Sequence, residues 1–239
     1  MKDSKPPISY ILPNLFTAAS CFCGVVSIIS SLNGKPLAAL LYIFISLIFD
    51  GLDGRVARLT NTTSKFGVEF DSLSDLIAFG AAPAVFFYVC LGHEYGKLGT
   101  LIAGFFVVFG AIRLARFNVT TGTYEPSVFI GLPIPTAAVI SAIYTYAYTK
   151  YPFLRGLEPC FLLAQLALAL LMVSNIRYPS FKKLDLHRAN MLKVLVLLIL
   201  VFSMLYLFTL ESILVCVSAY VLYGPLRAIY TLFRGKKTR

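Results

Sequence analysis

Apolar residues run along this chain in continuous stretches of about 20, and they do not alternate with polar ones. A helix rises 1.5 Å per residue, so about 20 residues cross the roughly 30 Å hydrocarbon core of a bilayer. Strands of a membrane barrel would instead alternate at every second position. The pattern therefore predicts an all-α, polytopic transmembrane bundle of about eight helices, at 13–33, 37–58, 68–91, 98–118, 132–150, 158–176, 191–209 and 212–232.

The composition points the same way. Hydrophobic residues fill 58% of the 239 positions, the mean hydropathy is +0.80, and only 13% of the residues are charged. A soluble domain usually carries about 25% charged residues. The composition excludes a water-soluble globular class, and the whole chain, 1–239, is expected to form a single transmembrane domain.

Basic residues are unevenly divided among the predicted loops. With eight spans and the N-terminus inside, 17 of the 21 basic residues fall in cytoplasmic segments, and the outer loops hold only Lys35, Lys97, Lys150 and Arg155. This bias predicts a multi-pass protein of the inner (cytoplasmic) membrane with both termini in the cytoplasm. The net charge of +10 then reflects topology and contact with anionic membrane lipids rather than nucleic-acid binding.

The stretch IFDGLDGRVARLTNTTSKFGVEFDSLSD carries four aspartates at helical spacings. Asp50 and Asp53 are three residues apart, and Asp71 and Asp75 are four apart, so each pair shares one helix face. The loop between the pairs, about 59–66, is short, so the two helices are antiparallel neighbours and the pairs meet at the cytoplasmic end. Carboxylates inside a membrane are costly and usually functional.

Such a cluster needs counter-charge. Two carboxylates about 4 Å apart repel by roughly 4 kcal/mol at an effective dielectric near 20. An all-oxygen donor set suits Mg²⁺ or Mn²⁺, and the lack of nearby His and Cys argues against Zn²⁺. Because two metal ions commonly clamp reacting phosphates, we expect two divalent ions held by Asp50, Asp53, Asp71 and Asp75.

Small residues surround both aspartate pairs. Gly54 and Ala57 follow the first pair, and Gly67 lies one turn before the second. They leave room for a nucleotide diphosphate to approach the backbone, with Arg58 and Ser64 placed to contact phosphate or base. Packing of neighbouring helices is the alternative explanation for such residues.

The order D-x2-D-G-x2-A-R-x8-G-x3-D-x3-D resembles the signature of the CDP-alcohol phosphotransferases and is matched at all eight fixed positions. The resemblance implies a core of six helices, about 9–185, with additional C-terminal helices at about 190–232. It also implies a homodimer with its site open to the inner leaflet. By the same resemblance Asp50, Asp53 and Asp71 bind the metal ions with Asp75 near them, and the CDP-lipid is held by Pro13, Asn14, Leu15, Phe16, Gly54, Ala57, Arg58, Ser64 and Gly67.

Three other segments bear on the acceptor alcohol: Arg113-Leu-Ala-Arg116-Phe-Asn118, Phe129 to Pro135, and Tyr178 to Lys182. They resemble the bacterial CDP-diacylglycerol–serine O-phosphatidyltransferases, a branch of that family. This implies CDP-diacylglycerol and L-serine as substrates, with the serine carboxylate contacted by Arg113, Arg116 and Asn118. A guanidinium suits a carboxylate, although both arginines equally fit a role as anchors at the inner face.

Other functions remain open at this point. A sibling enzyme that uses glycerol phosphate or inositol phosphate should need more basic residues near its site. A membrane carrier would place acids near the midplane and show repeated halves, whereas these acids lie at one edge. A prenyl-type transferase also uses paired aspartates, but the Gly-Ala-Arg spacing fits CDP better.

The acceptor hydroxyl must lose a proton as the new bond forms, which calls for a general base. Asp75 lies one helical turn deeper than Asp71, so we expect it to be the least firmly metal-bound of the four aspartates. It is therefore the predicted base. The alternative, that Asp75 is simply another metal ligand, differs in how a substitution should respond to excess metal.

Overall fold

The computed structural model describes residues 8–60, 62, 64–120 and 128–179, with short helical pieces at 214–215, 218–221 and 223–224. The chain divides into two units, Met1–Thr120 with Pro133–Val173, and Thr121–Leu132 with Ser174–Arg239. The α-helices of the first unit are α1 (Ile8–Leu32), α2 (Pro36–Thr60), α3 (Lys65–Asp75), α4 (Ala82–Cys90), α5 (Gly96–Thr120), α6 (Ile134–Lys150) and α7 (Glu158–Val173).

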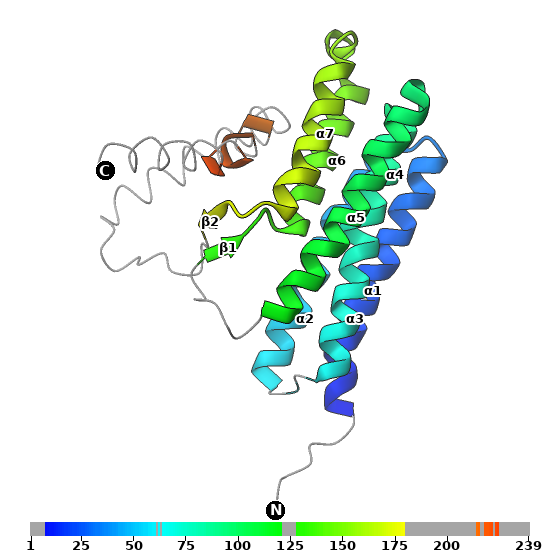
Figure 1. Ribbon diagram of the computed structural model, residues 1–239. Coiled ribbons are helices and arrows are strands. Elements are labelled where there is room, and N and C mark those ends of the chain that lie inside the picture. Colours follow the sequence, from blue (N-terminus) through cyan, green and yellow to red (C-terminus); the bar gives the residue numbers. More distant parts are fainter. Residues whose placement is uncertain are drawn as a thin grey trace, which may run out of the picture. The chain divides into compact units, whose positions relative to one another are not determined.

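The first unit is a bundle whose long helices run side by side (Figure 1). Helices α1 and α2 form an antiparallel pair joined by a tight turn at Gly34, whose φ of +66° is the left-handed conformation that glycine adopts at least cost. Phe79, Phe86 and Phe106 are fully buried and fill the centre of the bundle.

Buried hydroxyl groups join α1 to α2. Ser20 and Ser46 lie 2.7 Å apart through their Oγ atoms, and the hydroxyl of Ser46 also donates to the carbonyl of Ser20 at 3.0 Å. Further along, Ser27 donates to the carbonyl of Ala39 at 2.8 Å. In lipid such interhelical hydrogen bonds between small residues help to fix how two helices pack. They therefore hold α1 against α2.

The third predicted span is one continuous helical rod with a change of winding. Helix α3 ends at Asp75, a π-helical segment, η1 (Leu76–Ala81), follows, and α4 continues from Ala82. Pro83 has no N–H to donate to the carbonyl four residues earlier, and the N–H of Ala82 bonds to Ile77, five residues back. The wide turn therefore begins directly after Asp75.

The first six predicted spans correspond to α1, α2, the rod Lys65–Cys90, α5, α6 and α7. Within the described residues, four helical segments are long and apolar enough to cross a membrane, at Ile11–Leu32, Pro36–Thr60, Lys65–Cys90 and Gly92–Thr120. The chain is a helical membrane protein. The last of these segments includes a short 3₁₀ turn, η2 (Gly92–Tyr95), before α5.

The predicted count of about eight spanning helices is not confirmed. Helices α6 and α7 contain 17 and 16 residues and are shorter than the other spans, because prolines crowd their ends. Pro133 is the N-cap of α6, and Pro152 opens a short 3₁₀ turn, η3 (Pro152–Leu154), beyond its end. The predicted span 191–209 lies outside the described residues, and in 212–232 only the short pieces named above are described, all of them helical.

The second unit contains a feature that the hydrophobic pattern did not predict. Strands β1 (Val128–Ile130) and β2 (Arg177–Pro179) pair antiparallel, with Phe129 opposite Tyr178. The pairing continues where the N–H of Gly131 donates to the carbonyl of Ile176 at 2.8 Å. Two of the segments singled out for the acceptor alcohol thus meet in one short ribbon.

Candidate active site

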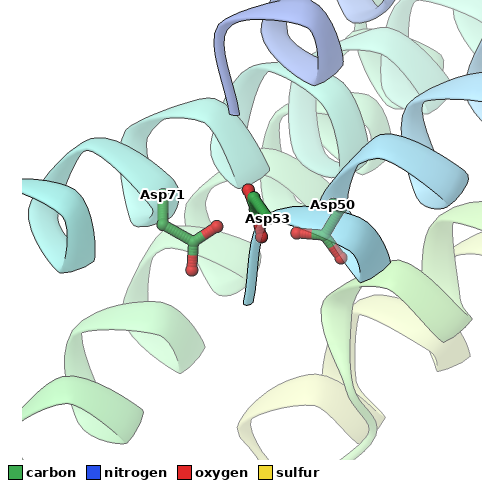
Figure 2. A group of neighbouring side chains, drawn as sticks. All are labelled: Asp50, Asp53 and Asp71. Carbon is green, nitrogen blue, oxygen red and sulfur yellow. The ribbon is translucent and has the colours of Figure 1, made fainter. Parts of the chain in front are cut away.

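Three of the four predicted aspartates converge. One carboxylate oxygen from each of Asp50, Asp53 and Asp71 lies within 4.8 Å of the other two, in the group hereafter called the aspartate triad. Figure 2 shows the three carboxylates turned toward one another. Asp50 and Asp53 come from the last turns of α2 and Asp71 from α3, as expected for helices joined by a short loop.

The donor chemistry of the triad fits a divalent cation. Its donors are all carboxylate oxygens, which suit Mg²⁺ or Mn²⁺. At 4.8 Å and an effective dielectric near 20, each ionised pair repels by roughly 3 kcal/mol. Asp53 is buried, with 6% of its surface exposed, so water screens little of this repulsion. The aspartate triad could therefore hold a metal ion that supplies the missing positive charge.

Asp75 lies beside the triad and is not part of it. Its carboxyl group contacts that of Asp50 and interacts electrostatically with the guanidinium of Arg113. The Asp75 side chain is buried, and its Oδ1 has no hydrogen-bond partner within the described part of the chain. A buried oxygen without a donor is unusual, and here it belongs to the residue expected to act as general base.

A cavity of about 200 Å³ opens next to the triad. Its walls come from α1, α2, α3 and the loop between the last two. It contains most of the residues predicted to hold the CDP-lipid, together with two of the triad aspartates. The lining residues are Pro13, Asn14, Thr17, Asp53, Gly54, Ala57, Arg58, Thr62, Ser64, Gly67, Val68 and Asp71.

Two structural details shape this cavity. Ser64 is the N-cap of α3, and its Oγ accepts the N–H of Gly67 at 3.0 Å. A Cβ on Gly67 would meet that Oγ at 3.2 Å and Oδ1 of Asn14 at 3.3 Å. Glycine at this position therefore lets α3 approach α1 closely, and Ser64 combines helix capping with its place in the cavity wall.

Two predicted contacts lie elsewhere. Leu15 is 60% exposed on the outside of α1, and Phe16 packs its ring against that of Phe49 at 6.3 Å. Neither lines the cavity. In a helix, only residues three or four positions apart share a face, so the consecutive residues 13–16 cannot all point into one site.

Thr17 lines the cavity and was missed by the sequence reasoning. Its hydroxyl donates to Oδ2 of Asp53 at 2.7 Å. Thr17 is three residues after Asn14 and four after Pro13, so its helix face was the available signal. Thr62 and Val68 were missed as well.

The three residues predicted to contact serine have different surroundings. Arg113 is 8% exposed and lies near Asp75 and Asp50. Arg116 donates to the carbonyls of Val173 and Met172 at the end of α7, at 3.1 and 3.2 Å. Asn118 donates to the hydroxyl of Ser72 at 2.9 Å. Of the three, Arg113 is adjacent to the aspartates, whereas the other two make the contacts described here with α7 and α3.

Comparison with known proteins shows which family this chain resembles. The family model of the CDP-alcohol phosphatidyltransferases matches residues 10–176, a range that includes all four aspartates and the cavity. The chain is 47% identical over 226 residues to a CDP-diacylglycerol–serine O-phosphatidyltransferase of Helicobacter pylori, covering 94% of each chain.

Two further relatives are less similar to this chain. An archaetidylserine synthase of Methanothermobacter thermautotrophicus is 38% identical over 182 residues, covering 75% of this chain and 74% of the relative. A CDP-diacylglycerol–serine O-phosphatidyltransferase of Bacillus subtilis is 34% identical over 172 residues, covering 72% and 92%. With the family model matching well over half of its length, the chain belongs to the CDP-alcohol phosphatidyltransferase family.

Proposed function

We propose that this protein transfers the phosphatidyl group of CDP-diacylglycerol to L-serine, giving phosphatidylserine and CMP. The observation that carries the proposal is the 47% identity to the H. pylori serine enzyme along 94% of both chains. An aspartate triad beside a cavity lined by Gly54, Gly67 and Arg58 supports it.

In the proposed reaction, the serine hydroxyl oxygen bonds to the β-phosphorus of CDP-diacylglycerol, the phosphorus that carries the lipid. The bond from that phosphorus to the oxygen bridging to CMP breaks, and CMP leaves with the electron pair. The serine hydroxyl proton passes to Asp75, whose buried Oδ1 lacks a donor within the described residues. Arg113, near Asp75, orients the serine carboxylate.

The CDP group would occupy the cavity between α1, α2 and α3. Arg58 supplies a guanidinium for phosphate, and Gly54 and Gly67 allow the diphosphate to approach the helices. Asp50, Asp53 and Asp71 would hold two divalent ions, Mg²⁺ or Mn²⁺, with Asp75 beside them. When bound, such ions neutralise the diphosphate and the charge that develops on departing CMP.

A panel of acceptors tests this function. Purified protein in detergent, supplied with CDP-diacylglycerol and Mn²⁺, should release CMP with L-serine and much more slowly with glycerol phosphate or inositol phosphate. Mass spectrometry should identify phosphatidylserine as the lipid product. A preference for glycerol phosphate would refute serine as the acceptor while leaving the family assignment intact.

Arg113→Ala should raise the KM for serine roughly tenfold or more, because a charged hydrogen bond contributes about 1.5–3 kcal/mol. The KM for CDP-diacylglycerol should change far less. Arg116→Ala should raise the serine KM too, as a predicted contact of the serine carboxylate. It should also lower thermal stability, because Arg116 donates to the backbone carbonyls at the end of α7. Arg155→Ala, an exposed arginine near the start of α7, is the control. Equal increases in both KM values would contradict a contact with the serine carboxylate.

We further propose that the protein lies in the inner membrane as a homodimer, with both termini and the site facing the cytoplasm. The excess of basic residues in the predicted cytoplasmic segments supports this orientation.

Cysteine labelling tests the orientation. In a Cys160→Ser background, which removes an exposed thiol, Lys97→Cys and Lys150→Cys should react with an impermeant reagent added outside intact cells. Lys65→Cys should react only after the membrane is opened. All three lysines are exposed on the protein itself, so accessibility depends on the side of the membrane. Labelling of Lys65→Cys from outside would reverse the orientation.

A further inference from the structure

The aspartates of the site come from α2 and α3, but a residue of α1 contacts both helices. The hydroxyl of Thr17 donates to Oδ2 of Asp53 at 2.7 Å, and its carbonyl accepts the hydroxyl of Ser74 at 2.9 Å. All three residues are buried, with 3%, 6% and 2% of their surfaces exposed. Ser74 immediately precedes Asp75, so Thr17 bridges the two aspartate-bearing helices at the level of the site.

We propose that Thr17 is a positioning residue: it holds the Asp53 carboxylate in the orientation in which Asp53 ligates a divalent cation. The inference rests on the proposed metal site. Carboxylates that bind metals are usually held by further hydrogen bonds, and loss of such a bond typically costs 10–100-fold in metal affinity or activity.

The hydrogen bond to Asp53 is the principal one of the Thr17 hydroxyl. That hydroxyl also lies 3.2 Å from the carbonyl of Pro13, but it has a single proton to donate. The shorter contact goes to a charged acceptor, and such hydrogen bonds are the stronger ones. The Thr17 hydroxyl on α1 thus orients a carboxylate that belongs to α2.

The two hydrogen bonds of Thr17 matter because the aspartates of the triad come from two different helices. Asp53 and Asp71 must keep their oxygens within reach of one cation, and a functional site tolerates displacements of only about 0.5 Å. By bonding to Asp53 on α2 and to Ser74 on α3, Thr17 fixes both helices against α1. The cation-binding arrangement is therefore set before any cation arrives.

The chain supplies a matched control on the same face of α1. Ser20 lies three residues after Thr17 and makes a buried hydrogen bond to Ser46 of α2 at 2.7 Å. The hydroxyl groups of this pair bond to each other and to each other's backbone carbonyls, and not to an aspartate. Ser20→Ala therefore reports what the loss of one α1–α2 hydrogen bond does to packing alone.

The test measures Mn²⁺ binding to purified protein without substrates, by following free Mn²⁺ in a titration. Thr17→Val keeps the shape and removes the donor, and it should weaken Mn²⁺ binding about 10–100-fold. Thr17→Ser keeps the hydroxyl and should bind Mn²⁺ nearly as the unsubstituted protein does. Ser20→Ala should lower thermal stability with unchanged Mn²⁺ affinity.

A second measurement serves if Thr17→Val folds too poorly to be purified. The Mn²⁺ concentration that gives half-maximal CMP release from isolated membranes does not depend on how much protein folds, and it should rise by a similar factor. Unchanged Mn²⁺ affinity in Thr17→Val, or an equal loss in Ser20→Ala, would overturn the positioning role. Absence of Mn²⁺ binding by the unsubstituted protein would instead overturn the metal site itself, and this inference with it.

Discussion

Asp71→Asn should lower turnover about a thousandfold or more while the protein stays folded. Asp71 is the contribution of α3 to the aspartate triad. Its loss should remove several kcal/mol of metal-based stabilisation of the transition state, and about 4 kcal/mol corresponds to a thousandfold in rate. Asp50→Asn and Asp53→Asn should behave alike. Without metal, each change relieves repulsion among carboxylates, so the fold should not suffer.

Glu69→Gln is the matched control for this result. Glu69 is an exposed acid on α3, two residues before Asp71. It should keep normal turnover, because the same loss of charge occurs outside the triad. CMP release at saturating substrate and thermal denaturation give the two readouts. Turnover within tenfold of normal for any triad variant would contradict the role of that aspartate.

Asp75→Asn should lower kcat by about 10²–10⁴, the usual contribution of a general base. Mn²⁺ binding and the KM for CDP-diacylglycerol should stay close to normal. The reason is position: Asp75 contacts Asp50 and lies near Arg113, but it is not one of the three residues whose oxygens converge. Direct Mn²⁺ titration and steady-state kinetics on the same preparation measure both quantities.

Excess metal distinguishes the two possible roles of Asp75, general base and metal ligand. A variant that has lost a ligand binds the ion weakly, so high Mn²⁺ should restore part of its turnover. A variant that has lost the base should gain nothing. Recovery of Asp75→Asn at high Mn²⁺ would show that Asp75 is a metal ligand and would leave the reaction without its proposed base.

The aspartate triad was predictable from the sequence because its geometry is local. Spacings of three and four residues define helix faces, and a loop of a few residues makes α2 and α3 antiparallel neighbours. Asp50, Asp53 and Asp71 then have to meet at one end of the bundle, as they do. The cavity residues Gly54, Ala57 and Arg58 follow from the same helix face.

Contacts between residues far apart in the sequence were not predictable in this way. Thr17 and Ser31 are both hydroxyl residues of α1, but the hydroxyl of Ser31 donates to the carbonyl of Ser27 in its own helix. Which hydroxyl reaches across to α2 depends on the rotation and depth of α1, and hydrophobic periodicity does not encode either. The role of Arg116 at the end of α7 was hidden for the same reason.

Two short departures from regular α-helix were also not predicted from the sequence. The position of Asp75 outside the triad coincides with a π-helical turn that begins at Leu76. Pro83 explains that turn once the structure is known, but a proline inside a membrane helix more often produces a simple kink. The ribbon of β1 and β2 was not foreseen, because three-residue strands are too short to show alternation.

The central claim is that a metal held by the aspartate triad is required for phosphatidyl transfer. It is tested most directly by chelating the purified protein, supplying CDP-diacylglycerol and serine, and following CMP release before and after Mg²⁺ or Mn²⁺ is restored. CMP release should vanish in the chelated protein and return with either ion. Full release from the chelated protein would contradict the claim.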